Sequence, residues 1–149
     1  MLSVFDPSVL ETFISRINKL SPDAKPQWGK MTAAQMLTHI QQPVKVGLGE
    51  LKLKKTIAGI LFGKWAMNKI RQGKGFGKNS PTDKHFIIRD DRNFEVEKQN
   101  AISIISRFSK GGPEMITKDP HPFFGKMTPQ DWDLLTATHL DHHLTQFNV

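Results

Sequence analysis

The stretch of this sequence that is most informative about the fold is THLDHHLTQ, at residues 138–146 near the C-terminus. Its His139 and His143 are four residues apart, so on a helix they project from nearly the same face, about one turn and roughly 6 Å apart along the axis. Two imidazoles at this spacing can bind one metal ion. Helices also carry such pairs by chance, and a one-residue error in helix phase would exchange His143 with His142. The stretch therefore predicts a helix that carries part of a candidate metal site.

A third ligand has to come from another helix, and His39 in the stretch MLTHI at residues 36–40 is the natural candidate. This segment begins at a capping box, Thr32 to Gln35, in which each of the two side chains satisfies a backbone N–H at the helix start. His39 follows on the apolar face, which should turn inward. A hydrogen-bonded core histidine is the simpler alternative. We expect His85 and His121 in loops, without a special role.

Helical periodicity and capping residues predict five helices. The expected spans are from Asp6-Pro7 to a stop at Ser21-Pro22, from Thr32 to a kink or an end at Pro43, residues 54–70, from Asp91 or Asn93 to Gly111, and from Thr128-Pro129 almost to the C-terminus. Residues 71–92 should form a long irregular connection, with 85–89 as a short extended segment. Because no convincing set of alternating strands is present, the sequence predicts an all-α bundle, as one domain over residues 1–149.

The stretch GKMT occurs twice, at residues 29–32 and 125–128, each time after an aromatic residue and at a predicted helix start. Chance or shared helix-start chemistry would explain the repeat. The two helices that follow are the ones that carry the candidate ligands.

The tail from His139 to Phe147 resembles the closing motif of the DinB-like superfamily, and MLTHI at 36–40 resembles its second-helix motif. HPFFGKMT at 121–128 resembles more narrowly a DinB-related branch of proteins of unknown function. The resemblance covers almost the whole chain and implies a four-helix bundle in which His39, His139 and His143 bind a divalent metal. Superfamily members with known activities are metal-dependent transferases and isomerases that use low-molecular-weight thiols. The branch itself has no established reaction.

Three imidazole ligands would suit Zn or Ni first, and Fe or Mn also fits. Three protein ligands leave an open position, where a bound thiol or water loses its proton more readily. Because the chain has no cysteine, the thiol would be a cosubstrate. No general base is evident, and we expect Asp133 and Asp141 at most to orient a histidine. The leading hypothesis is a metal-dependent enzyme such as a thiol-dependent transferase, and the alternative is a non-catalytic binding or scaffold bundle.

Positive charge is concentrated in residues 45–78, where Glu50 is the one acid. The basic residues of this segment are Lys45, Lys52, Lys54, Lys55, Lys64, Lys69, Arg71, Lys74 and Lys78. The segment is either a solvated surface, or a guide for a small anionic or thiol substrate, or a surface for nucleic acid or a membrane. Trp65 and Phe76 could stack on bases, but the core needs such residues too. Without a recognition motif, nucleic acid is the less favoured partner.

The absence of cysteine excludes disulfides and thiolate ligands. The N-terminus shows no signal peptide, since Asp6-Pro7 interrupts any apolar run. The most apolar stretch, residues 56–67, contains Lys64 and is shorter than the roughly 20 residues that a membrane span needs. We therefore expect a cytoplasmic protein without a membrane partner. A homodimer is expected because closed two-fold dimers are the commonest assembly.

Overall fold

The computed structural model describes residues 2–149. Five α-helices and two short 3₁₀-helices follow one another along the chain. Their bounds are α1 Pro7–Asn18, α2 Ala33–Gly47, α3 Ile57–Arg71, η1 Lys84–Phe86, α4 Phe94–Gly111, η2 Gly112–Met115 and α5 Pro129–Gln146. Over these described residues no strand forms, and an isolated bridge joins His121 to Gly125. The prediction of an all-α fold is confirmed.

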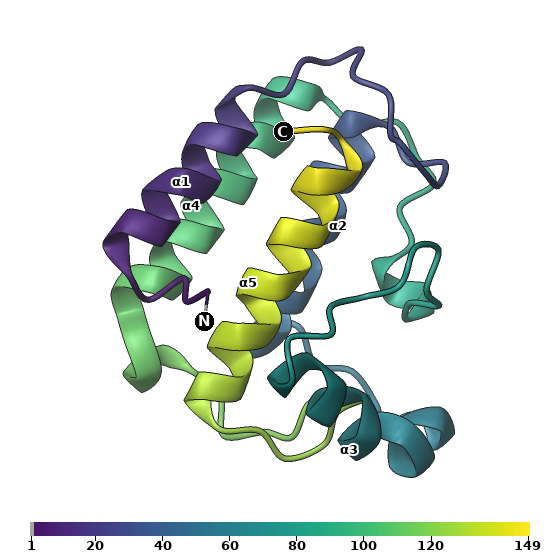
Figure 1. The fold of residues 1–149 in the computed structure, drawn as a ribbon, viewed down its shortest axis with the longest axis vertical. Coiled ribbons are helices and arrows are strands. Elements are labelled where there is room, and N and C mark those ends of the chain that lie inside the picture. The colour runs from purple at the N-terminus through teal and green to yellow at the C-terminus, as the bar shows by residue number, and fades with distance from the viewer. Residues whose placement is uncertain (1) are drawn as a thin grey trace.

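Four of the helices, α1, α2, α4 and α5, pack side by side as a bundle (Figure 1), in which α2 and α1 each contact both α4 and α5. Their apolar faces meet in one core. The largest fully buried side chains of this core are Trp132, Phe13, Phe108, Ile17, Met36, Leu37, Ile40, Ile105, Leu140 and Leu144. Helix α3 lies outside the bundle, and its main helical neighbour is α5 (Figure 1). No helix within residues 2–149 is long and apolar enough to cross a membrane.

The predicted helix starts are formed by local hydrogen bonds. Asp6 accepts from the backbone N–H of Ser8 at the start of α1, and complete capping boxes open α2 at Thr32 and α5 at Thr128. Of the two candidates for the start of α4, Asn93 is the cap. These side chains satisfy backbone N–H groups that have no partner within the first turn of a helix.

The two copies of GKMT adopt the same local structure. Gly29 and Gly125 have φ of +81° and +77°, a left-handed conformation that glycine adopts without strain. Each turn leads into a threonine-capped helix start, at Thr32 and at Thr128. The repeat therefore reflects shared helix-start chemistry.

The sequence left two alternatives at Pro43, a kink in the helix or its end. The end does not occur, because helix α2 continues to Gly47. Proline has no N–H, so the carbonyl of His39, four residues earlier, has no donor from position 43. The last turn of α2 is held by burial instead, since Val44 and Val46 both belong to the core. Tertiary packing here outweighs one missing helical hydrogen bond.

The connection between α3 and α4 is irregular except for η1, which confirms the predicted long connection. The expectation of an extended segment at 85–89 is wrong for its first two residues, which lie in η1. Asp83 caps this short helix by accepting a hydrogen bond from the backbone N–H of His85. The connection packs against α2 through Phe86, which is buried.

Candidate metal centre

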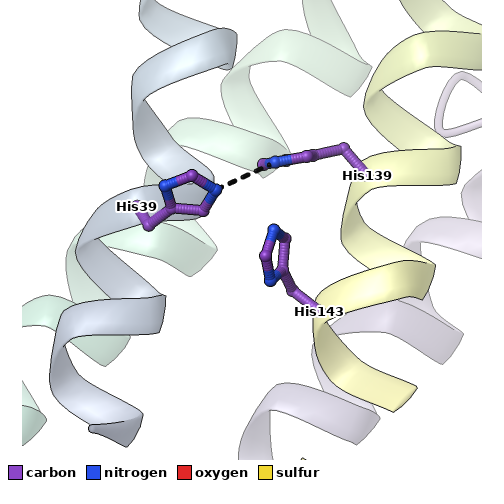
Figure 2. A group of neighbouring side chains, drawn as sticks. All are labelled: His39, His139 and His143. Carbon is purple, nitrogen blue, oxygen red and sulfur yellow. Dashed lines mark hydrogen bonds between the residues drawn. The ribbon is translucent and has the colours of Figure 1, made fainter. Parts of the chain in front are cut away.

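The three predicted histidines converge between α2 and α5. Figure 2 shows His39 on α2 facing His139 and His143 on α5, with the three rings directed into one space. One ring nitrogen from each lies within 4.8 Å of the others, and Nε2 of His39 is 3.1 Å from Nε2 of His139. The structure therefore brings together all three residues that the sequence proposed.

The phase of α5 decides which of the adjacent histidines joins this cluster. His143 is buried, and its ring centroid is 4.6 Å from that of His39. His142 is half-buried and instead packs its ring edge-on against Trp28 and Phe76. The exchange of His142 for His143, which the spacing alone left open, does not occur.

His39 is oriented by the backbone of η1. Its Nδ1 lies 2.8 Å from the carbonyl oxygen of Phe86. A carbonyl oxygen can only accept, so Nδ1 carries the proton and Nε2 keeps its lone pair for the space shared with His139 and His143. An outer hydrogen bond of this kind is the usual way in which a metal-ligating histidine is held in one tautomer.

His143 is oriented in the same way by Gln146. Its Nδ1 lies 2.8 Å from Oε1 of Gln146, and Nε2 of that amide donates to the carbonyl oxygen of Trp28 at 2.6 Å. Sequence reasoning missed both Gln146 and Phe86 as supporting residues. Gln146 had a visible signal, because it follows His143 at the i, i+3 spacing that lets side chains meet on a helix. Phe86 acts through its backbone, which side-chain patterns do not reveal.

The two carboxylates that were expected at most to orient a histidine do not do so. Asp133 accepts a hydrogen bond from the backbone N–H of Val4 at 2.7 Å, and Asp141 forms an ion pair with Arg16 at 2.7 Å. Both are used to attach the N-terminal part of the chain to α5. The reason is helix phase, since neither residue shares the face of His139 and His143.

The two remaining histidines lie outside the cluster, as predicted. His85 is exposed and contacts Asp83. His121 is in a loop but deeply buried, between the rings of Phe124 and Trp132. Its Nδ1 accepts from the backbone N–H groups of Phe123 and Phe124. The sequence expectation of an ordinary loop histidine is therefore incomplete, because this ring organises the 121–125 turn.

Burial keeps the three clustered rings neutral. It lowers the pKa of His39, and it lowers the pKa of His143 to about 3. The pKa of His139 lies well below its usual value, first because the ring is buried and then because His143 and His39 are its neighbours. Neutral imidazole is the form that binds metals. The cluster is therefore in its ligating form at neutral pH.

The donor set fits a divalent transition metal. Zn–N bonds of about 2.0–2.1 Å in tetrahedral geometry place ligand nitrogens roughly 3.3 Å apart, close to the 3.1 Å between His39 and His139. A chain with three imidazole ligands would leave at least one coordination position for another molecule.

The match to known protein families covers this site and nearly all of the chain. A family model described as "Protein of unknown function (DUF1569)" matches residues 5–149. The chain belongs to this family. No curated protein and no solved structure matches it.

A cavity of about 270 Å³ opens onto the histidine cluster of the DUF1569 protein. Its walls come from the long connection and from the segment before α2. The lining residues besides the four histidines 39, 139, 142 and 143 are Met31, Phe76, Asn79, Ser80, Pro81, Thr82, Phe86, Ile87 and Ile88. The lining contains no acid, and besides the four histidines it has six apolar residues and three polar ones, Asn79, Ser80 and Thr82. Such a space suits a small molecule with an apolar body and a polar or anionic group.

Proposed function

We propose that this protein is a divalent-metal protein of the DinB-like type, with Zn or Ni as the first expected ion and His39, His139 and His143 as its ligands. The observation that carries the proposal is the convergence of three neutral imidazoles, of which His39 and His143 are buried and donate from Nδ1 to fixed acceptors, the carbonyl of Phe86 and the side chain of Gln146. The Nε2 atoms of His39 and His143 are thereby left as acceptors that face the same space as His139, and a shared cation would be bound by all three rings.

We propose further that the site is catalytic, in a thiol-dependent transferase or a related metal-dependent enzyme. The support is the cavity beside the open side of the cluster, which a purely structural site would not need. A divalent ion there would act as a Lewis acid and would lower the pKa of a thiol or water bound to it. The apolar walls would hold the body of the substrate and exclude water, and Asn79, Ser80 and Thr82 would fix its polar group.

The rim of this cavity favours an anionic substrate. Lys78 precedes Asn79 of the lining, and its ammonium lies 4.7 Å from the centre of the Trp28 ring. Trp28 in turn packs against His142 of the lining, so this cation–π contact holds a positive charge one side chain away from the cavity. With no acid in the lining, a thiolate or carboxylate would meet a favourable field on entry.

The test of metal binding is elemental analysis of protein purified without an affinity tag or chelator. We expect about one divalent ion per chain, with most of it lost in His39→Ala and in His143→Ala. His142→Ala is the matched control, because His142 is on the same helix and lines the same cavity but lies outside the cluster, and it should keep its metal. Full metal content in both ligand variants would rule the site out.

A second experiment separates an enzyme from a scaffold. Protein loaded with Co(II) should develop a thiolate-to-cobalt charge-transfer band when a low-molecular-weight thiol such as glutathione is added, because the open position would take the sulfur. A loaded protein that shows no such band with any thiol tried would favour the non-catalytic bundle.

A further inference from the structure

Helix α3 packs onto the rest of the protein through its glycines. A Cβ atom on Gly59 would lie 2.6 Å from the backbone of Phe123, and one on Gly63 would lie 2.0 Å from the carbonyl oxygen of the same residue. Thr56 adds a hydrogen bond from its N–H to the carbonyl of Pro122, and Arg71 binds Asp131 of α5 through two N–H groups. The side of α3 that faces the protein is therefore lined by Gly59 and Gly63 in the first half of the helix, and by the buried Met67 and Ile70 in the second half.

The large apolar side chains in the first nine residues of α3 point the other way. Ile57, Ile60, Leu61, Phe62 and Trp65 are between 57% and 80% exposed. They lie within nine consecutive residues, whereas the other exposed large apolar residues, such as Val96 and Met115, are scattered. Single exposed apolar residues are normal on a monomer, but a contiguous set marks an interaction surface. We call these five side chains the α3 apolar face.

Lysines precede, follow and, at Lys64, interrupt the α3 apolar face, and no acid is near them in sequence. Between Leu51 and Thr82 the chain contains eight basic residues and no Asp or Glu. Lys54 and Lys55 precede the helix, while Lys64 and Lys69 lie on it, and all four are exposed. The ammonium of Lys69 sits 3.9 Å from the centre of the Trp65 ring. The partner of this surface must therefore be both apolar and negatively charged.

We propose that α3 binds the surface of an anionic lipid bilayer, lying in the plane of the interface with the α3 apolar face inserted among the acyl chains. Helices with bulky apolar residues on one side and lysines beside them bind membranes in this way, with insertion of about 5–10 Å. Lysine side chains can extend from an inserted helix to the headgroups. The protein would then be attached to the membrane surface without crossing it.

Charge decides between this occupant and two others. In a two-fold dimer through α3, the lysines of both copies would meet with no acid in residues 51–82 to compensate them. Nucleic acid would pair with the lysines, but its phosphates would leave Ile57, Ile60 and Leu61 in water. An anionic bilayer satisfies both kinds of side chain. This departs from the expectation of no membrane partner, which rested on the length of the apolar stretch and not on its exposure.

The test uses the full chain with vesicles of phosphatidylcholine alone and of phosphatidylcholine mixed with phosphatidylserine. We expect co-sedimentation with the anionic vesicles, weak binding to the neutral ones, and weaker binding as salt is raised. Tryptophan fluorescence should shift to the blue on binding, and Trp65→Phe should remove the shift, since Trp132 is already buried and Trp28 is half-buried against His142 and Lys78, outside α3.

Two variants and two matched controls identify the surface. Ile57→Ser/Leu61→Ser should weaken binding roughly tenfold or more, and Lys54→Gln/Lys55→Gln/Lys64→Gln by about a hundredfold, at about fivefold per lysine. Two control variants make the same kinds of change at exposed positions elsewhere and should bind vesicles as the wild type does. They are Val96→Ser/Met115→Ser and Lys19→Gln/Lys110→Gln/Lys118→Gln. Because the α3 side chains are exposed, these changes should leave the fold intact, as circular dichroism can verify.

Three results would overturn the proposal. The first is that the protein does not bind anionic vesicles, and the second is that the Ile57→Ser/Leu61→Ser variant binds them as well as the wild type. The third is that the wild type forms a dimer, that the same two substitutions make it a monomer, and that neither protein binds vesicles. Submicromolar binding of DNA or RNA, lost in the triple lysine variant and without vesicle binding, would assign the face to nucleic acid instead.

Discussion

Gln146 fixes the tautomer of His143. The amide of Gln146 donates from Nε2 to the carbonyl of Trp28, so its Oε1 must face the imidazole, 2.8 Å from Nδ1. An amide oxygen can only accept, and the proton of His143 is therefore on Nδ1. The other nitrogen, Nε2, is left unprotonated for a metal. One side chain outside the cluster thus prepares a ligand within it.

Replacing Gln146 should therefore weaken metal binding without removing a ligand. We expect Gln146→Leu to lower the affinity for Zn(II) about 10–100-fold, the usual effect of losing an outer hydrogen-bond partner. Competition with a chromophoric chelator would measure it. Gln42→Leu is the control, because Gln42 on α2 bonds only the helix carbonyl of Thr38. Equal affinities for wild type and Gln146→Leu would show that the hydrogen bond plays no part.

Removing metal should lower the stability of the folded protein. An ion that binds only the folded state stabilises it by about 2.7 kcal/mol when present at a hundred times its Kd. The midpoint of thermal unfolding should therefore fall when a chelator is added to the wild type and to His142→Ala. In His39→Ala the chelator should change the midpoint little. The midpoint of each protein is compared with and without chelator, so any effect of the substitution itself on stability cancels. A shift of equal size in His39→Ala would argue against these ligands.

His121 should make the metal-free protein less stable as the pH falls. Burial lowers its pKa to about 4 from a usual value of 6.5, so between these values the unfolded chain takes up a proton that the folded chain does not. Stability from this residue is complete above pH 6.5 and is lost towards pH 4, by at most about 3 kcal/mol. Protonation at Nδ1 would also break its bonds from Phe123 and Phe124.

Urea unfolding of metal-free protein at several pH values would measure this effect. In His121→Gln the slope of stability against pH should be smaller by up to about 1.4 kcal/mol per pH unit. A His121→Gln slope identical to the wild type would contradict the prediction.

The packing of α3 should depend on Gly63. A methyl group there would meet the carbonyl oxygen of Phe123, a backbone atom that cannot rotate away. We expect Gly63→Ala to cost about 1–3 kcal/mol of packing, partly offset by about 1 kcal/mol of helix propensity. Faster hydrogen exchange in α3 would report the loosening. Gly75→Ala, where the nearest atom is 3.7 Å away, should leave exchange unchanged.

The homodimer expected from the sequence stays a prediction. If the α3 apolar face binds lipid, the dimer must form through another surface, and Ile57→Ser/Leu61→Ser should keep the dimeric mass. Light scattering over a range of concentrations would measure it. A monomer mass throughout would dismiss the dimer.

Local patterns account for much of what the sequence predicted correctly. The starts of α2 and α5 depend on Thr32 and Thr128, whose hydrogen bonds reach only three residues ahead. His139 and His143 share a face because a helical turn is 3.6 residues. His39 was placed on an inward face by its apolar neighbours, which made it the candidate third ligand beside His139 and His143, and the family resemblance added support. Of the two alternatives at Pro43 the helix end does not occur, because packing of Val44 and Val46 outweighs the missing hydrogen bond. At residues 85–86 the cap at Asp83 forms η1 in place of the expected extended segment.

The sequence by itself determined the all-α class, the helix starts and three candidate histidines, because helix periodicity and capping are interactions between near neighbours in the chain. Only the tertiary structure decided the partners of those elements. It paired Asp141 with Arg16 instead of a histidine, gave His39 the carbonyl of Phe86, and placed α3 outside the bundle with Trp65 in solvent. Periodicity shows that a helix has an apolar face. Which neighbour covers that face depends on contacts between residues far apart in sequence, such as Gly63 against Phe123.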